Sequence, residues 1–441
     1  MQPEGPRWFN AVAVPLAGVA FGVMAVTCGF ENHSRGLRIG ATAVLLAVGW
    51  LGIIRGWLRP PALGILMGAL GAVFAALLIA TIFSIDPTYS AKTLFRQHFW
   101  FLLLVPAIAA VFADPGRQRW ALVGLAAAGV VAAIPGIVLY FKAQELQEAG
   151  WIRRASDFVW YATDDLGRPY QRARGMLESY TRSALVQVFA LAALVALGMR
   201  ALEARRWVHL AIAVVAAGVC AFFLLLTKSR GAWGAAGMAM IITFVCCRGK
   251  WWILIAGAIL GALLLTAMPQ ERARAATIFR QLGQPDLLLS GRLSLWRQGF
   301  PAIASSPLVG IGHGPNIFLR PAAQERGLAL LTDRPQPDLH SFYLQTQAES
   351  GAVGMLAYLV LFGVLLRRAG TAWRSGAATS PATQAATGVV VSLLIVGVIY
   401  CFNEDHIGQL FWSCLGLLAA VSGPAPPESP PHPDPESRPR A

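Results

Sequence analysis

Long apolar segments alternate with short polar connections along most of this chain. Windows of roughly 17 to 23 apolar residues recur about twelve times, and an α-helix of that length crosses the hydrocarbon core of a bilayer. The pattern therefore predicts an all-α integral membrane protein with about 12 transmembrane helices. The expected spans are residues 8–30, 37–57, 62–84, 97–113, 119–141, 183–200, 207–227, 231–247, 251–268, 341–366, 384–402 and 406–422.

Two connections are much longer than the others, at about residues 142–182 and 269–340. A polytopic chain that concentrates arginines and a histidine in one long loop is expected to act at one membrane face. The sequence thus predicts a transmembrane domain at residues 1–422 that carries both loops. The tail at residues 423–441 is rich in Pro, Glu and Ser and is expected to be disordered and cytoplasmic.

Composition supports the membrane assignment. The chain is 56% hydrophobic and 13% charged, with a mean hydropathy of +0.57, and these values exclude a soluble domain of 441 residues. The net charge of +14 has two sources, which are orientation signals in the short loops and a second group of arginines on the opposite side. We therefore predict a membrane-lipid environment and no nucleic-acid partner.

Basic residues in short loops mark the cytoplasmic side of a membrane protein. Every second short connection is net basic, so both termini are expected in the cytoplasm and both long loops in the periplasm. The basic residues of these connections are Arg7, Arg55, Arg59, Arg117, Arg119, Arg200, Arg205, Arg206, Arg248, Lys250, Arg367, Arg368 and Arg374.

Neither disulfides nor a metal site is predicted. The cysteines fall inside or at the ends of the expected helices, which excludes a disulfide framework in the long loops, and no Cys/His metal spacing occurs. The first outer loop carries Glu31 without a second acid, and Asp164-Asp165 is the only adjacent acidic pair in the two long outer loops. We expect no metal and no cofactor. The cysteines are Cys28, Cys220, Cys246, Cys247, Cys401 and Cys414.

Ionisable residues gather at the outer ends of the expected helices and are almost absent from their centres. An ion-coupled transporter needs ionisable groups near the membrane midplane, so this distribution favours a reaction on a lipid headgroup at the outer surface. The residues concerned are Arg35, Arg38, Lys92, Arg96, Arg172, Arg174, Arg182, Lys228, Arg230, Arg292, His340, Glu349, Glu404, Asp405 and His406.

Three outer segments are the candidates for chemistry. In the first, Thr227 to Gly231, a tight connection between two helices would hold Arg230 at headgroup depth, where its guanidinium could grip a diphosphate. The alternative is an arginine that reaches an ordinary phospholipid phosphate.

The second segment, Ser290 to Arg297, predicts a helix capped by Ser290 with Leu293, Trp296 and Phe300 on one face. Arg292 would lie in its first turn, where an anion is also favoured. The alternative is that Arg292 pairs with a carboxylate of the loop.

The third segment runs from Asp338 to Gly351. Asp338 is expected to cap the tenth helix, with His340 in its first turn. A helix N-terminus disfavours imidazolium and would keep this histidine able to accept a proton, although Asp338 acts in the opposite direction. The alternative is a histidine that only belongs to the interfacial belt.

The order of four short motifs resembles that of the bacterial O-antigen ligases, over roughly residues 170–355. The motifs are T-x-S-R-G-A-W from Thr227, S-G-R-x-x-x-W from Ser290, the G-x-G stretch from Gly310 and D-x-H-S-x-x-L from Asp338. The resemblance implies a GT-C-like glycosyltransferase of the inner membrane with its active site facing the periplasm.

Such an enzyme would move a glycan from undecaprenyl diphosphate to a sugar of the lipid A–core oligosaccharide. By this resemblance Arg230 and Arg292 would bind the donor diphosphate, and His340 would act as base or orient the acceptor hydroxyl. Arg174 and its following glycine look like the family's arginine-glycine pair, and Arg174, Lys228 and Arg297 are expected to contact the donor diphosphate or the acceptor.

Arginines can replace a metal in spreading the charge of a diphosphate leaving group. We therefore expect a single displacement that inverts the anomeric carbon. Three alternatives remain, which are an O-antigen polymerase, a protein O-oligosaccharyltransferase and a lipid-linked oligosaccharide flippase. Ser179-Tyr180-Thr181 weakens the first because related polymerases often carry Asn-Pro-Asn there. The short tail weakens the second, and the lack of charge at the helix centres weakens the third.

Overall fold

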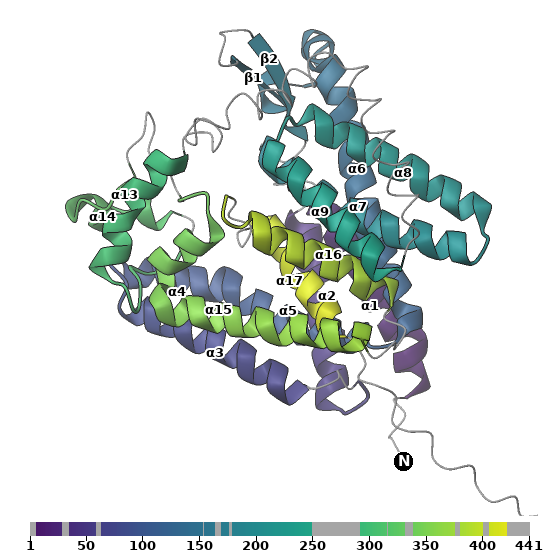
Figure 1. Cartoon of the computed structure of the whole chain (residues 1–441), viewed down its shortest axis with the longest axis horizontal. Coiled ribbons are helices and arrows are strands. Elements are labelled where there is room, and N and C mark those ends of the chain that lie inside the picture. The colour runs from purple at the N-terminus through teal and green to yellow at the C-terminus, as the bar shows by residue number, and fades with distance from the viewer. Residues whose placement is uncertain are drawn as a thin grey trace, which may run out of the picture.

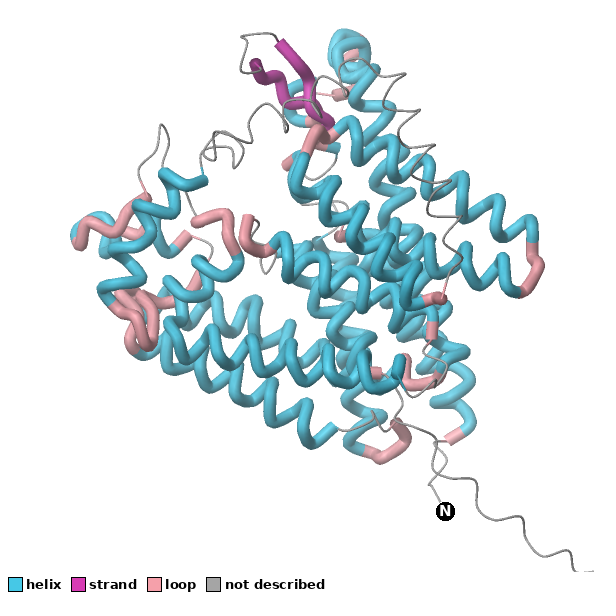
Figure 2. The backbone as a smooth tube through the Cα atoms, viewed as in Figure 1, coloured by secondary structure: helices cyan, strands magenta, loops and turns pink. Residues whose placement is uncertain are grey.

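Long helices make up most of the computed structural model (Figures 1 and 2). The structure describes residues 6–28, 35–58, 63–152, 154–163, 169–175, 179–248, 292–314, 316–330, 338–374, 380–399 and 405–420. The α-helices are α1 (Val14–Thr27), α2 (Arg35–Ile54), α3 (Leu63–Ile82), α4 (Pro87–Thr93), α5 (Phe99–Val111), α6 (Pro115–Glu148), α7 (Tyr180–Glu203), α8 (Trp207–Leu226), α9 (Arg230–Cys246), α13 (Arg292–Ser305), α14 (Pro321–Glu325), α15 (Phe342–Arg374), α16 (Pro381–Val396) and α17 (Asp405–Ala419).

Eight described helices are long and apolar enough to cross a membrane, and three further apolar helices are shorter. Each of these helices overlaps one of the predicted spans, and the remaining predicted span, residues 251–268, lies outside the described part of the chain. The chain is therefore a mostly helical, multi-pass membrane protein. The total of 12 spans stays a prediction, and the expected tail at residues 423–441 also lies outside the described residues.

The predicted span at residues 97–113 was wrong at its start, because the helix begins ten residues earlier. Asp86 caps it by accepting a hydrogen bond from the Tyr89 N–H at 3.0 Å. The chain then continues from α4 through one π-helical stretch, Leu94–His98, into α5. Lys92 and Arg96, which the sequence placed at the outer end of this span, lie within the helix in exposed positions.

The first long connection is also more ordered than expected. Helix α6 continues to Glu148, beyond the predicted end at residue 141, and a β-hairpin follows. Strands β1 (Val159–Thr163) and β2 (Pro169–Ala173) pair antiparallel, so the described fold is not purely helical. Figure 1 shows the hairpin at one end of α6 and α8. Ala173 packs there against Phe223 of α8.

Small residues bring the helices into close contact. A Cβ at Gly388 of α16 would overlap Thr243 of α9, and a Cβ at Gly129 of α6 would overlap Ala190 of α7. Small residues have this role in membrane proteins because the hydrophobic effect does not drive helices together inside a lipid bilayer. Van der Waals packing at short range stabilises their association instead. The central helix α7 is buried along most of its length.

Helix α15 is interrupted near its start. Gly351 has φ +62° and ψ −167°, which breaks the ladder of helical hydrogen bonds. A neighbouring loop supplies the missing partners. Ile311 N–H donates to the Ala348 carbonyl at 2.8 Å, and Ala352 N–H donates to the Pro307 carbonyl at 2.9 Å. A Cβ at position 351 would overlap the backbone of Leu308, so glycine is required for both its conformation and its size.

We expect Gly351→Ala to destabilise the protein because it adds a left-handed residue and a steric overlap, which together cost about 1–3 kcal/mol or more. Gly363→Ala is the matched control, since Gly363 lies in the same helix with open space around its Cβ position. The measurement is the thermal unfolding midpoint of the detergent-extracted proteins by tryptophan fluorescence. Equal midpoints for Gly351→Ala and the wild type would contradict this account of the break.

Candidate active site

His340 lies in a tight turn immediately before α15. The Asp338 carboxylate oxygen Oδ1 accepts two hydrogen bonds from this residue, one from its backbone N–H at 2.6 Å and one from Nδ1 at 2.7 Å. His340 has φ +49°, in the left-handed region. Its side chain is 47% exposed, whereas that of Asp338 is 12% exposed. The imidazole is therefore accessible while the carboxylate behind it is enclosed.

The expected cap of this helix was wrong. Helix α15 begins at Phe342, and the Ser341 hydroxyl accepts the Leu344 N–H at 3.4 Å in the capping position. Asp338 folds back on His340 instead, because the left-handed residue turns the chain before the helix can start. His340 is accordingly not in the first turn of the helix.

Asp338 determines the state of the imidazole. Burial alone would raise the pKa of Asp338, but the hydrogen bonds and charge of His340 hold this pKa below its usual range, and Arg182 lowers it further. An ionised carboxylate beside Nδ1 favours the tautomer that carries its proton on Nδ1. The other ring nitrogen, Nε2, is then the basic one.

Helix α13 packs its Trp296 side against the His340 turn. Trp296 Nε1 donates to the Leu339 carbonyl at 3.0 Å, and a Cβ at Gly299 would overlap the Leu339 side chain. Arg292 is four residues before Trp296, so it lies on the same side of α13. Arg297 is exposed and projects about half a turn away from the buried face.

The predicted face of this helix was wrong. Its buried residues are Leu295, Gly299 and Ala302, whereas Phe300 is 52% exposed. Trp296 of the predicted face does pack half-buried against the cluster that contains Leu295 and Leu339, whereas Phe300 points outward. The expected cap, Ser290, lies outside the described residues.

The connection between α8 and α9 is as tight as the sequence predicted. Thr227, Lys228 and Ser229 separate the two helices, and Lys228 adopts φ +53° with only 2% of its surface exposed. Trp233 Nε1 donates to the Leu224 carbonyl at 3.0 Å and ties the two helices together. Arg230 is the first residue of α9, with a partly exposed side chain.

Helix α16 packs along α9, which begins with Arg230, and its end contacts the segment next to the His340 turn. It runs antiparallel to α9, since Cys247 contacts Gln384 and Thr243 faces Gly388. Continuing this register brings the first turn of α9 level with the end of α16. Just beyond that end, the Gly397 carbonyl accepts the Phe342 N–H at 2.7 Å. Arg230, the Arg292 side of α13 and His340 thus lie at one end of the bundle, which we call the site end.

Arg174 is partly engaged by the β-hairpin. Its Nη1 donates to the Ser156 carbonyl at 3.0 Å, and its guanidinium lies 5.1 Å from the Trp160 ring centroid. The Ser183 hydroxyl donates to the Arg174 carbonyl, which joins the hairpin to the start of α7. Arg182 precedes this serine, and its charge acts on Asp338. The structure therefore brings this connection near His340 through Arg182.

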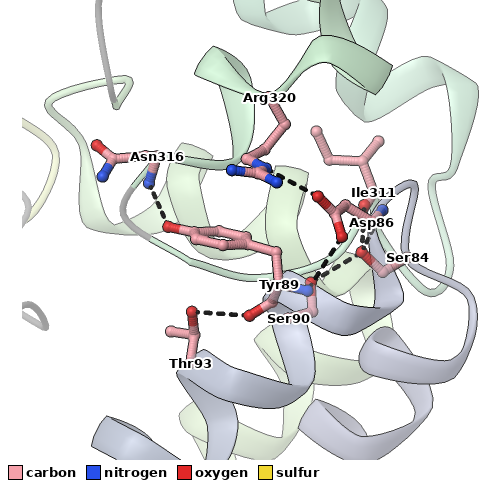
Figure 3. Close-up of polar contacts among 8 residues, drawn as sticks. All are labelled: Ser84, Asp86, Tyr89, Ser90, Thr93, Ile311, Asn316 and Arg320. Atoms are coloured by element: carbon pink, nitrogen blue, oxygen red, sulfur yellow. Dashed lines mark hydrogen bonds and ion pairs between the residues drawn. The ribbon is translucent and has the colours of Figure 1, made fainter.

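A polar clamp holds the 310–320 loop against α4 (Figure 3). Arg320 Nε donates to Asp86 Oδ2 at 2.8 Å, and its guanidinium lies 4.9 Å from the centroid of Tyr89. The Tyr89 hydroxyl accepts the Asn316 N–H at 3.1 Å, and the Ile311 carbonyl accepts the Ile85 N–H at 2.9 Å. The clamp thus fixes the loop that pairs with the break in α15.

The clamp also fixes the charge state of Asp86. The backbone hydrogen bond from Tyr89 is the largest influence, and with Arg320 it keeps the pKa of Asp86 below its usual range despite partial burial. Sequence reasoning missed the clamp, although Asp86-Pro87 is a typical helix start. The partner, Arg320, is 234 residues away and gives no local signal.

Two histidines that sequence reasoning did not single out meet beneath the clamp. The rings of His98 and His313 are buried, with centroids 5.2 Å apart in an edge-to-face arrangement. Burial lowers the pKa of His313 well below its usual range, and His98 lowers it further, so His313 is neutral. Within the described segments no group of three or more His, Cys, Asp or Glu residues could hold a metal ion.

Removing the Asp86 carboxyl should destabilise the clamp. We expect Asp86→Ala to lose the helix cap and the arginine contact, at about 1–2 kcal/mol. Asp86→Asn should lose less, because asparagine still caps a helix while only the partly exposed ion pair weakens. Thermal midpoints of the two variants would measure this order, and an Asp86→Asn midpoint at or below that of Asp86→Ala would contradict it.

The part of the chain that forms the site end also matches a known protein family. Residues 215–359 match the family model described as O-antigen ligase. The match contains Arg230, Arg292 and His340, together with the 310–320 loop and the break in α15. Arg174 lies outside it. A search of curated proteins gave no match to this chain.

Proposed function

We propose that this chain is an O-antigen ligase, because residues 215–359 match the O-antigen ligase family, whose members are glycosyltransferase-like enzymes. It transfers a glycan from undecaprenyl diphosphate to a sugar hydroxyl of the lipid A–core oligosaccharide. The observation that carries this proposal is the accessible imidazole of His340, held by the enclosed carboxylate of Asp338 at 2.7 Å.

The proposed reaction is one displacement. Nε2 of His340 takes the proton of the acceptor hydroxyl while the acceptor oxygen attacks the anomeric carbon of the donor. The bond from that carbon to the diphosphate oxygen breaks, and the anomeric configuration inverts. Asp338 stabilises the imidazolium that forms. A positioned base of this kind contributes about 10²–10⁴-fold to the rate.

The leaving group is a lipid diphosphate, and Arg230 and Arg292 are proposed to bind it. Their guanidinium groups can each donate two hydrogen bonds to phosphate oxygens, which stabilises the charge that develops on the leaving group without a metal. Their place at the site end, with His340, supports this assignment.

Arg174, Lys228 and Arg297 have smaller proposed roles in substrate binding. Arg174 is already engaged by Ser156 and Trp160, so it shapes the hairpin as much as it contacts substrate. Lys228 is buried in the α8–α9 connection, so it would contact only a substrate group that enters this connection. Arg297 is exposed on α13 and is suited to the acceptor's polar groups.

We propose that the site end faces the periplasm of a bacterial inner membrane and that both termini are cytoplasmic. The basic short connections support this orientation. The gathering of Arg230, Arg292 and His340 at one end of the bundle is consistent with a reaction at a single membrane face.

An O-antigen polymerase is the second candidate, because the matched family also supports a polymerase-like enzyme with a lipid-linked donor. The donor chemistry would be the same, and only the acceptor would differ. The acceptor is therefore the decisive variable in an assay.

The test is transfer of a glycan from purified undecaprenyl diphosphate-linked donor to lipid A–core acceptor by the reconstituted protein, with EDTA present. We expect wild-type transfer to persist, His340→Ala to lose about 10²–10⁴-fold, and Asp338→Asn to lose about 10–100-fold. His209→Ala is the matched control, because His209 is exposed near the start of α8, away from the site end.

Chain growth with the lipid-linked donor alone, and no transfer to lipid A–core, would establish the polymerase instead. Transfer by His340→Ala at the wild-type rate would overturn the proposed base. Loss of wild-type transfer in EDTA, restored by a divalent cation, would overturn the metal-independent mechanism.

A further inference from the structure

We propose that Gln345 and Glu349 are positioning residues that hold His340 in its reactive orientation. This inference rests on the proposed function, since it concerns the same imidazole. Neither residue touches the imidazole in the contacts described. They act on the backbone of the turn that carries it.

Gln345 links this turn to α15. Its Oε1 accepts the Leu339 N–H at 2.9 Å, and its Nε2 donates to Glu349 Oε1 at 2.5 Å. Only one orientation of the amide satisfies both contacts, because its oxygen must face the N–H and its nitrogen must face the carboxyl. The side chain is buried, so water does not readily replace either partner.

Glu349 links Gln345 to the clamped loop. Besides Gln345, its carboxyl accepts the backbone N–H of Gly314, and its own carbonyl accepts the Gly312 N–H at 3.1 Å. That loop is fixed in turn by Asp86 and Arg320 (Figure 3). A continuous set of hydrogen bonds thus connects the clamp on α4 to the backbone beside His340.

The turn requires such support because His340 has φ +49°. A left-handed residue that is not glycine costs about 1–2 kcal/mol. Three contacts on adjacent residues hold the strained turn: Asp338 bonds the His340 N–H, Gln345 bonds the Leu339 N–H, and Trp296 bonds the Leu339 carbonyl. If Gln345 is removed, the turn can relax, and a shift of about 1 Å in a reacting group can cost about 100-fold in rate.

The donors around Glu349 argue against a direct role in proton transfer. Its carboxyl faces the Gln345 amide and the Gly314 N–H, both from the protein itself. The acceptor hydroxyl is instead expected at Nε2 of His340, on the exposed side of the turn. Glu349 therefore helps to position the His340 imidazole and does not itself exchange a proton with the acceptor.

The test uses Gln345→Ala, Gln345→Glu and the exchanged pair Gln345→Glu/Glu349→Gln in the full-length reconstituted protein. Gln345→Glu removes the amide N–H that donates to Glu349 Oε1 and brings two carboxyl groups together. The exchanged pair restores the set, because the carboxylate introduced at position 345 accepts the Leu339 N–H and the new amide at position 349 donates to it. Gln347→Ala is the matched control, since Gln347 bonds the Pro307 carbonyl and not the turn.

The first measurement is hydrogen–deuterium exchange of the peptide containing the Leu339 and His340 amides. We expect exchange at least about tenfold faster in Gln345→Ala and Gln345→Glu, with unchanged exchange in α9. The exchanged pair and Gln347→Ala should exchange as the wild type does. A general loss of structure would instead accelerate exchange in α9 as well.

The second measurement is the kinetics of glycan transfer. Gln345→Ala and Gln345→Glu should lower kcat by about 10–100-fold with little change in KM for the donor, and the exchanged pair should recover most of kcat. Unchanged exchange at Leu339 and His340, or faster exchange with unchanged kcat, would overturn the proposal. If the wild type transfers no glycan at all, the proposed function fails, and the exchange pattern alone decides whether these residues hold the turn.

Discussion

The break in α15 at Gly351 is the constraint on which the rest of the site end depends. Backbone groups inside a membrane protein need partners, because no water in the hydrocarbon core can replace a lost hydrogen bond. Residues 307–312 provide those partners, so this loop must lie against the broken turn. The same loop continues to Gly314, whose N–H bonds the Glu349 carboxyl, and to Arg320, which bonds Asp86 before α4. The local irregularity thus organises segments that are far apart in the sequence.

The same arrangement explains how an imidazole near the membrane becomes a defined base. Asp338 fixes the tautomer of His340, and α13 and Gln345 hold the turn between them. A base on an unsupported loop would sample many orientations, which wastes much of the advantage of proximity. The proposed chemistry therefore depends on backbone hydrogen bonds as much as on the side chains that meet the substrates.

Hydrophobic length predicted most of the helices, because crossing a bilayer demands long apolar segments wherever they occur. It did not predict the start at Pro87, because Lys92 and Arg96 are charged residues that hydrophobic length leaves outside the span. The three candidate segments were visible as short motifs, and the tight α8–α9 connection followed from its length. An effect of Asp338 on His340 was expected, but the bond from Gln345 to the Leu339 N–H was not predicted, because the left-handed turn at His340 gives no signal in the sequence. The role of Arg320 was not predictable, because its partner, Asp86, is 234 residues away.

The most direct test of the central claim is a structure of the reconstituted protein bound to undecaprenyl diphosphate, determined by electron cryo-microscopy. The account predicts diphosphate oxygens about 3 Å from the guanidinium nitrogens of Arg230 and Arg292, on the side of the bundle to which His340 presents Nε2. A diphosphate bound away from both arginines, or on the far side of α13 from the His340 turn, would contradict it.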